Sequence, residues 1–596
     1  MKKVYLIILS VLVLLQPALA GVVRPDAAAR YAQGILGMKQ SPVLENTRSL
    51  RAPGRDSQSA DPEYYIFNNP DGGWAIIAAD DRVNPVIGYS YEGSFSISDM
   101  PDNLQWWMDG VADVIDAVRQ SANEAPESVS AAWESLRDGR APVINGNSKY
   151  LPTAEWGQTP PYNNLCPVVS GETSHAATGC VATSMAIIMR YNCWPAHGVG
   201  VIGGYTTETK KTYILPYDLA DNAYDWDNMP LTNGSSIKAN WTDQQKREVA
   251  QLMLDCGVAV EMDYTADASA AASGKMLNAM KENMLYSQKA ALVSRSSYKR
   301  DEWFALIKNE IDNGRVVYYA GDSDAGGHAF VCDGYEADAN SPKIRINWGW
   351  NGFCNGFYTL DLSVSQYDFA FSDMQEAVIG LAPNTAQVDI DETIGLVCIN
   401  HNGFYGIEPL TPADITAGSE MNFYVGWFMN NDNRDITAEF KVCLEDKDGN
   451  IKQEGWNLKI KIPAADGYVY CDETQKTVLN VSPELTDHFR LYIKNSKGKW
   501  EPMRGNYDIL PDVDGIICGV IQDPVIVIPD DCTAGQEIDL SLSLGFTHVK
   551  TVKWSVNGTA LKGSKVTLVK GQNAIRADVE YLDDTKGSVF STLQVE

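Results

Sequence analysis

Cysteine pairs and histidines, the residues that most often hold a metal ion, are scarce in this chain. The 596 residues include six histidines, and none of the eleven cysteines belongs to a Cys-x-x-Cys pair. Structural zinc sites usually take two such pairs, so no zinc site is expected. The cysteine count is odd, which predicts at least one free thiol.

An excess of positive charge is also missing. The chain carries 77 Asp and Glu residues against 48 Lys and Arg residues, a net charge of −29. Phosphate groups repel such a chain, which argues against a nucleic acid or an anionic membrane as its partner. The hydrophobic share of 44% is that of an ordinary globular protein, and the length predicts several domains.

No apolar run beyond the N-terminus is long enough to span a bilayer. The N-terminus has two lysines, a short apolar run from Val4 to Leu15 and the small-x-small sequence Ala18-Leu19-Ala20. This pattern predicts a cleaved signal peptide over residues 1–20, with an uncleaved anchor as the alternative. We therefore expect an exported protein that is secreted, periplasmic or held at the cell surface, without a transmembrane segment.

Changes in residue composition and hydrophobic pattern along the chain predict the domains. Residues 21–140 predict a small α+β unit, in which strand-like runs flank the turn NPDGG and a helix follows. The apolar residues of that helix are Trp106, Val111, Val114, Ile115 and Val118. The unit ends in RDGRAPVINGNSK, which reads as an exposed, cleavable linker.

The remaining sequence divides at about residue 384. Residues 141–383 place helix-like runs before strand-like runs, which favours an α+β fold. From residue 384, short alternating runs between turn signals predict β-sandwich structure. We divide it into a β-sandwich domain over residues 384–522 and a C-terminal Ig-like β domain over residues 523–596.

The stretch SHAATGCVATSMAIIMRY, residues 174–191, predicts a nucleophile. Cys180 follows a glycine and opens an apolar helix. A helix N-terminus lowers the pKa of a thiol and so favours the reactive thiolate. The alternative, equally compatible with the spacing alone, is a structural cysteine on a core helix.

A neighbouring imidazole is the second device that activates a thiol. His328, in DAGGHAFVCDGY, begins an apolar strand after two glycines and is the favoured partner. His175 lies in the loop before Cys180 and is expected to bond the backbone, and His197 lies in a Pro/Gly turn at the surface. The run NWGWNG then offers Asn347 or a tryptophan to orient the histidine, unless these tryptophans are only core residues.

Several blocks of this region resemble the streptopain family of papain-like cysteine peptidases. The blocks are HAATGCVAT, GGHAFVCDGY, INWGWNGFCNGFYTLD, GQTPPYNNLCP, VEMDYT, VYYAG and QEAVIGLAP. The resemblance runs through residues 141–383, and residues 21–140 resemble, more loosely, the propeptide of that family. It implies a papain-like catalytic domain with a helical subdomain and an antiparallel β subdomain.

The resemblance also assigns roles to the residues. Cys180 matches the nucleophile, His328 the general base and acid, and Gln158 the side-chain donor of the oxyanion hole. Trp348 matches the residue that supports the histidine, and Trp350 would flank it.

The function implied is that of a secreted cysteine endopeptidase made as a zymogen, which needs no metal and no organic cofactor. Its expected partners are protein and peptide substrates, its own propeptide as an intramolecular inhibitor, and an unknown surface ligand of the C-terminal β domains. Removal of the propeptide is expected near Arg140–Pro142. The alternatives are another acyl-transfer enzyme, such as an amidase or transglutaminase, and a catalytically vestigial secreted binding or adhesion protein.

Two departures from the family pattern are visible. The stretch between Gln158 and Cys180 is shorter, so the non-primed side of the cleft is expected to differ. The region also carries five further cysteines, and Cys166–Cys193 or Cys332–Cys354 disulfides are open possibilities.

Overall fold

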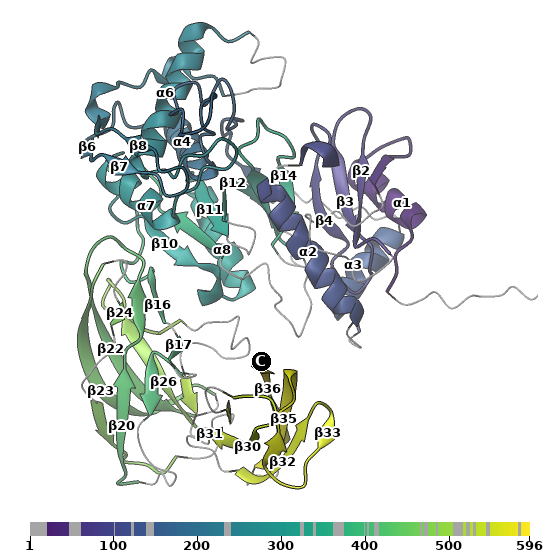
Figure 1. Cartoon of the computed structure of the whole chain (residues 1–596), viewed down its shortest axis with the longest axis vertical. Coiled ribbons are helices and arrows are strands. Elements are labelled where there is room, and N and C mark those ends of the chain that lie inside the picture. The colour runs from purple at the N-terminus through teal and green to yellow at the C-terminus, as the bar shows by residue number, and fades with distance from the viewer. Residues whose placement is uncertain are drawn as a thin grey trace, which may run out of the picture. The chain divides into compact units, whose positions relative to one another are not determined.

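A computed structural model provides the coordinates of the chain (Figure 1). It describes residues 21–46, 61–100, 102–120, 124–138, 148–231, 240–321, 327–337, 341–360, 375–398, 400–401, 404–409, 417–446, 448–464, 468–469, 475–483, 487–504, 517–519, 525–528, 532–543, 549–581 and 586–595. The expected signal peptide and the expected cleavage site near Arg140–Pro142 lie outside these residues. The chain forms two compact units, Met1–Ala271 with Phe304–Asp373 and Ala272–Trp303 with Met374–Glu596. No helix of the described residues is long and apolar enough to cross a membrane.

The first unit combines helices with one large sheet. Its helices are α1 (Pro25–Ile35), η1 (Ile97–Asp99), α2 (Asp102–Gln120), α3 (Glu127–Arg137), α4 (Cys180–Asn192), η2 (Leu219–Asp221), η3 (Trp226–Asn228) and α6 (Asp243–Ala259). Its strands are β1 (Val43–Asn46), β2 (Tyr64–Asn68), β3 (Trp74–Ala78), β4 (Val86–Ser90), β5 (Ser148–Tyr150), β6 (Val201–Ile202), β7 (Tyr205–Thr206), β8 (Tyr213–Ile214), β9 (Tyr217–Asp218), β11 (Val317–Gly321), β12 (His328–Glu336), β13 (Lys343–Asn347) and β14 (Gly356–Thr359). Helix α8 (Arg300–Asp312) contains residues of both units.

The sheet of the first unit is continuous between residues 43–90 and residues 317–359. Its strand order is β1-β2-β3-β4-β14-β13-β12-β11, and β5 pairs with β12. The join is antiparallel, with Phe357 opposite Tyr89 and Tyr358 opposite Gly88. The strands expected around NPDGG are confirmed, but nothing in the linear sequence indicated that they form one sheet with the strands after residue 315.

The helices of this unit follow the periodicity of the sequence. On α2, the buried residues include Val111, Val114, Ile115 and Val118, as expected, whereas Trp106 is only half-buried. Helix α6 begins with the expected capping box, because Gln245 N–H donates to Thr242 Oγ1 at 3.2 Å and Thr242 N–H donates to Gln245 Oε1 at 2.9 Å.

The second unit is rich in strands. It contains α7 (Ser273–Glu282) and η4 (Arg295–Ser297), and β10 (Ala291–Ser294) pairs with β15 (Glu376–Ile379). The strands up to residue 519 are β16 (Leu396–Cys398), β17 (Asn400–His401), β18 (Phe404–Tyr405), β19 (Ile407–Pro409), β20 (Glu420–Val425), β21 (Phe428–Asn430), β22 (Ile436–Glu445), β23 (Ile451–Ile462), β24 (Tyr468–Val469), β25 (Gln475–Val478), β26 (His488–Lys494), β27 (Trp500–Pro502) and β28 (Ile517–Gly519). The strands after it are β29 (Val525–Val527), β30 (Glu537–Asp539), β31 (Ser541–Ser543), β32 (Val549–Val556), β33 (Thr559–Ala560), β34 (Lys565–Thr567), β35 (Gly571–Tyr581) and β36 (Lys586–Val595).

Two hydrophobic cores organise these strands. One core is built from residues between Leu396 and Met503, and the other from residues between Ile526 and Val595. The alternating run EIDLSLSLGF is divided into β30 and β31. The reason is that β30 pairs with β34 whereas β31 pairs with β29.

The four cysteines that the sequence left open for pairing are not joined by disulfides. Cys166, Cys193, Cys332 and Cys354 are all free thiols, so neither of the pairings left open by the sequence is formed. Cys166, Cys332 and Cys354 are buried and Cys193 is exposed.

A buried carboxylate fastens the segment around β9 to helix α6. Asp255 is fully buried and accepts hydrogen bonds from Tyr217 Oη at 2.6 Å, Gln251 Nε2 at 2.8 Å, Tyr224 Oη at 3.0 Å and Asn222 Nδ2 at 3.3 Å. Burial raises the pKa of Asp255 from 3.8 to about 6, and these donors only partly oppose the rise.

This pKa predicts a pH-dependent stability. The folded state holds the Asp255 proton more tightly than the unfolded chain does. The stabilisation of the fold by the protonated Asp255 carboxyl is therefore complete below about pH 4 and is lost as the pH rises through about 6. The Tm of the wild-type protein should therefore fall relative to that of Asp255→Asn between pH 4 and pH 7. Asp243→Asn, an exposed position on the same helix, is the control. A Tm difference between wild type and Asp255→Asn that does not change with pH would contradict the raised pKa of Asp255.

Candidate active site

Cys180 is the first residue of helix α4. The preceding residue, Gly179, has φ 85° and ψ 145°, a conformation open almost only to glycine. Residues 181–189 are all buried, so the helix is a rigid mount. The sequence prediction of a turn at Gly179 followed by a buried helix is confirmed, and the thiol lies where the helix dipole favours a negative charge.

The turn before Cys180 is packed tightly against the segment 262–270. A Cβ atom at Gly179 would lie 2.8 Å from the carbonyl oxygen of Ser269 and 2.9 Å from the side chain of Met262. Ala177 is held from both sides, since its N–H donates to Thr265 O at 3.1 Å and its carbonyl accepts from Ser269 Oγ at 2.8 Å. These contacts fix the position from which α4 starts.

The sulfur of Cys180 has opposing influences on its pKa. Burial raises the pKa, whereas hydrogen bonds from the backbone of Ala329, Val181 and Cys180 itself lower it, and the net shift is upward. The Ala329 contact also locates the sulfur, because Ala329 follows His328 on β12.

Gln158 is brought to the Cys180 turn by a backbone contact. Thr178 N–H donates to the carbonyl of Gln158 at 3.2 Å, and Gln158 is 7% exposed. Thr178 is held in turn by its hydroxyl, 2.7 Å from that of Thr183 on α4. Only Gly179 therefore separates the position bonded to Gln158 from the nucleophile candidate.

His328 is the first residue of β12 and is half-buried. It lies opposite Gly321 in the antiparallel pair β11–β12. Helix α4 packs against both of these strands. The structure thus brings the start of α4, the start of β12 and the Gln158 segment together. The catalytic roles assigned to Cys180, His328 and Gln158 stay predictions.

The run NWGWNG forms a loop after β13 that contacts the other parts of the site. Trp348 is fully buried, and its ring lies 4.9 Å from that of Phe330, which shares a face of β12 with His328. Its indole N–H donates to Cys354 O at 3.1 Å. Gly349 packs on Thr183 of α4, and Asn351 N–H donates to Trp156 O at 2.9 Å.

Asn347 and Trp350, the other two candidate supports of the histidine, make no ring contact within the described part of the chain of the kind that Trp348 makes with Phe330. Asn347 directs its amide away from the strand pair, since Nδ2 donates to Thr153 Oγ1 at 3.0 Å and to Ala154 O at 2.9 Å. Trp350 is half-buried, and its indole nitrogen has no hydrogen-bond partner among the described residues.

The remaining histidines of this region behave as the sequence predicted. His175 is exposed, and its Nδ1 contacts the carbonyl oxygen of Cys166. His197 is exposed, and its Nδ1 lies 2.8 Å from the carbonyl oxygen of Gly198.

Helix α2 covers the site, which the sequence did not reveal (Figure 1). Trp106 packs directly on the backbone of Gly321, and its ring centroid lies 6.4 Å from that of His328. Trp107 lies 6.0 Å from Trp348, and Asn103 Nδ2 donates to the carbonyl of Trp348 at 2.8 Å. The only sequence signal was the pair of adjacent tryptophans near the start of the predicted helix.

A thiol at a helix N-terminus, beside a histidine-bearing strand and under a covering segment, is the arrangement of a latent thiol hydrolase. Residues 156–358 match the Peptidase C10 family, and residues 20–115 match a family described as Spi protease inhibitor. The chain is 30% identical to Streptopain of Streptococcus pyogenes over 60% of its own length and 90% of that protein. The chain belongs to the Peptidase C10 family of cysteine peptidases.

Two further relatives have been compared. The chain is 30% identical to Thiol protease/hemagglutinin PrtT of Porphyromonas gingivalis over 67% of its own length, and it spans about half, 47%, of that protein. A solved fragment of Prevotella intermedia prointerpain A is 28% identical, with a TM-score of 0.44 over 57% of this chain and 99% of the fragment.

Gly179→Ala should displace the start of α4. The new Cβ meets backbone and side-chain atoms in a conformation that L-residues avoid, so we expect a loss of about 2–4 kcal/mol in stability, measured as a fall in Tm. Gly171→Ala is the matched control, because Gly171 also has a positive φ of 87° but has no atom within 4 Å of an added Cβ. Equal Tm shifts in the two variants would show that the close packing around Gly179 does not add to the cost of an alanine there.

Proposed function

We propose that the chain is an exported cysteine endopeptidase, made as a zymogen, that hydrolyses peptide bonds of proteins. The observation that carries the proposal is the position of the Cys180 sulfur at the N-terminus of α4, bonded by the backbone of the residue next to His328. In this proposal His328 takes the Cys180 proton once the site is uncovered, which gives a thiolate and an imidazolium.

Hydrolysis then follows in two steps. The Cys180 thiolate attacks the scissile carbonyl, and Gln158 Nε2 and the Cys180 N–H donate to the oxyanion. His328 protonates the leaving amine, which leaves an acyl-enzyme. A water molecule, deprotonated by His328, attacks the acyl carbon and releases the new carboxyl terminus and the thiol. No step in this sequence draws on a metal or an organic cofactor.

Trp348 is proposed to support His328 through packing. Its indole N–H is already committed to Cys354 O, so its contribution is the rigid ring that backs Phe330 on the histidine's face of β12. Asn347 would act indirectly, by holding the loop to residues 153–154, and Trp350 would flank the cleft.

Residues 21–140 are proposed to be the inhibitory propeptide. Helix α2 lies against His328, Phe330 and Trp348, and β4 extends the sheet at β14. A substrate cannot occupy the same surface, so removal of this segment is proposed to start activity. Access of water would also reduce the burial that raises the Cys180 pKa.

The other domain boundaries remain proposals. They are a signal peptide over residues 1–20, the peptidase domain over 141–383, a β-sandwich over 384–522 and an Ig-like domain over 523–596. The separate hydrophobic cores on either side of residues 504–525 support the last division. A protein without catalysis that binds a surface ligand through its β domains is the rival function.

Cys180→Ala decides between hydrolysis and binding. We expect the variant to lose casein hydrolysis, because no other group can form the acyl-enzyme, and to remain unprocessed if maturation is autocatalytic. Cys193→Ala is the control, because Cys193 is an exposed thiol at the far end of the same helix. Casein cleaved equally well by both variants would exclude Cys180 as the nucleophile, and no cleavage by the mature wild type would remove the peptidase proposal.

Trp106→Ala should weaken latency. The ring covers the backbone beside His328, so its loss opens the site while the rest of α2 remains packed. We expect freshly purified precursor to gain casein-hydrolysing activity several-fold faster than wild type in a time course. Gln105→Ala, a change of the neighbouring residue on the same helix, should follow the wild-type time course. Slower activation of Trp106→Ala would mean that the ring assists maturation rather than blocking the site.

A further inference from the structure

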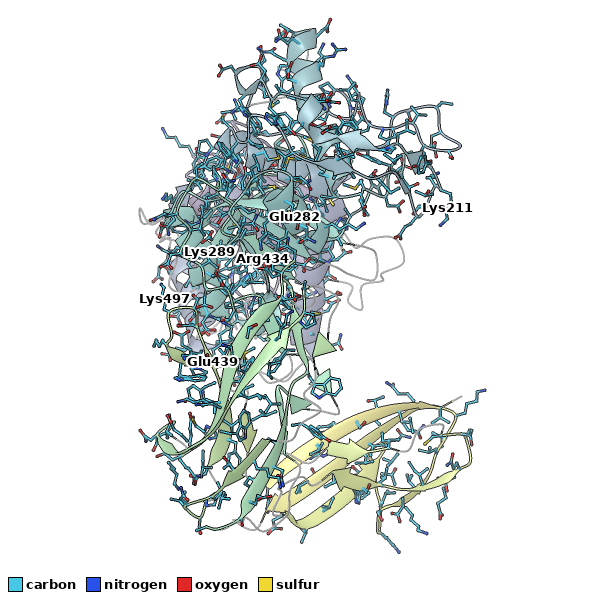
Figure 2. All side chains as sticks on the ribbon, turned by 90° about the vertical axis from the view of Figure 1, so that its left-hand side faces the viewer. Lys211, Glu282, Lys289, Arg434, Glu439 and Lys497 are labelled. Carbon is cyan, nitrogen blue, oxygen red and sulfur yellow. The ribbon has the colours of Figure 1, made fainter. Side chains whose placement is uncertain are left out.

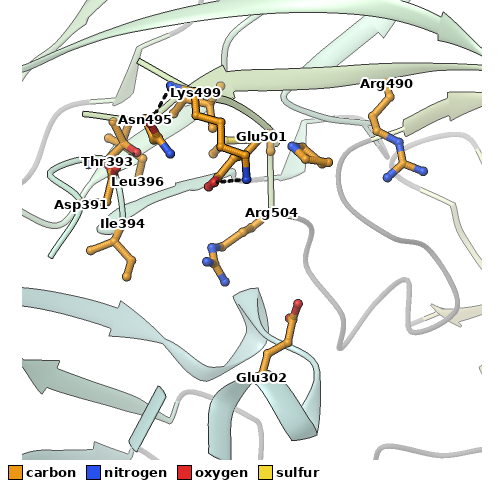
Figure 3. A pocket seen from close by; sticks show the side chains of 13 residues that line it. Glu302, Asp391, Thr393, Ile394, Leu396, Arg490, Asn495, Lys499, Glu501 and Arg504 are labelled. Carbon is orange, nitrogen blue, oxygen red and sulfur yellow. Dashed lines mark hydrogen bonds and ion pairs between the residues drawn. The ribbon is translucent and has the colours of Figure 1, made fainter. Parts of the chain in front are cut away.

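The second unit contains a cavity that the proposed peptidase chemistry does not use. It has a volume of about 440 Å³ and is lined by residues from three segments: the first turn of α8, residues 391–396, and the β26–β27 hairpin with the residues after it (Figure 3). Pockets of this size commonly bind small ligands.

Elsewhere in the second unit, polar contacts join residues before and after residue 384. Lys281 on α7 is fully buried, and its Nζ lies 3.0 Å from each carboxylate oxygen of Asp432. Beside this pair, Asn433 Nδ2 donates to Glu282 Oε1 at 2.8 Å and Arg434 donates to Gln288 O at 3.0 Å, and Figure 2 shows Glu282 and Arg434 close together.

The carboxylates that line the cavity are already satisfied. Asp391 accepts from the backbone and hydroxyl groups of Thr393 and of Ser496, at 2.6–3.1 Å. Glu501 pairs with Lys499 at 3.1 Å, and Glu302 accepts from Lys299 N–H at 3.1 Å.

Arg504 is different from these groups. Its guanidinium lies 4.2 Å from the centroid of the Tyr298 ring, a cation–π contact, and it has no carboxylate partner among the residues that the structure describes. In a chain with a net charge of −29, such a cation is unusual. The Tyr298 hydroxyl beneath it also has no hydrogen-bond partner within the described part of the chain.

The rest of the wall defines the ligand. Asn495 uses its Oδ1 to accept from Lys497 and Lys499, which leaves its Nδ2 as a second donor on the pocket side (Figure 3). Ile394, Leu396, Ile493 and Met503 supply an apolar surface. The described lining contains no aromatic ring on which a flat ring ligand could stack.

We propose that this pocket binds the C-terminal carboxylate of a short peptide with an aliphatic last residue. The guanidinium of Arg504 takes the carboxylate in a two-pronged contact, and the aliphatic side chain lies on the apolar wall. The source of such peptides rests on the proposed function, since each cleavage of a protein creates a new carboxyl terminus. Binding itself does not require hydrolysis.

The test uses the full chain with Cys180→Ala, so that the probe is not cleaved. Acetyl-Gly-Leu-Leu with a free carboxylate, and the same peptide as its amide, are titrated by isothermal calorimetry. We expect saturable binding of the acid and at least about tenfold weaker binding of the amide. Arg504→Met should weaken binding of the acid by a similar factor, because it keeps the packing on Tyr298 but removes the charge.

Lys497→Met is the matched control, because Lys497 is an exposed cation on the same hairpin that is already paired with Asp389 at 2.7 Å. It should bind the acid as the parent does. If Arg504→Met lowers the Tm, Ile394→Trp decides instead, since it fills the cavity and keeps the charge. The proposal is overturned if the acid and the amide bind with equal affinity or if no saturable binding is seen. It is also overturned if Arg504→Met and Ile394→Trp both bind the acid as the parent does. Arg504-dependent binding of glucuronate that is tighter than that of the peptide overturns the peptide as occupant.

Discussion

The chemistry of this protein depends on where one sulfur atom is held. Cys180 opens α4 only because Gly179 adopts a backbone conformation that side chains exclude, and because the turn before it is packed against Ser269 and Met262. The same packing sets the helix against β12, so that the sulfur meets the backbone of Ala329 beside His328. In the proposed mechanism, a shift of this turn would move Cys180 relative to both His328 and Gln158, because the turn carries the contacts to Ala329 and to the Gln158 carbonyl.

Latency follows from how that site is covered. Trp106, Trp107 and Asn103 lie along the face that His328, Phe330 and Trp348 present, and the strands of residues 43–90 continue the sheet of the peptidase. A burial that excludes substrate also raises the pKa of the thiol. In the proposed zymogen mechanism, the exclusion of substrate and the raised pKa of the thiol therefore have one cause, and removal of the covering segment relieves both.

The strand-rich second unit is fastened to residues of the peptidase sequence rather than merely tethered. The Lys281–Asp432 pair is buried, and breaking one partner of such a pair typically costs several kcal/mol because it leaves an uncompensated charge. Burial lowers the pKa of Lys281, and Asp432 opposes that shift. Residues 390–396 run between these parts with Ile390 and Leu396 buried, so they act as a structural element and not as a free linker.

Local sequence determined the elements: the capping box of α6, the turn before Cys180, the strands that begin at His328 and after NPDGG, and the alternation beyond residue 384. These depend on neighbours within a few residues, and the motif blocks added the identity of the site residues. Only the tertiary structure decided that α2 lies over His328, that β4 and β14 join two segments into one sheet, and that the cysteines of the suspected pairs stay apart. It also decided that Arg504 lines a cavity and has no carboxylate partner among the described residues. Each of these depends on the packing of residues more than a hundred positions apart or on the absence of a partner in space, and a linear pattern carries neither.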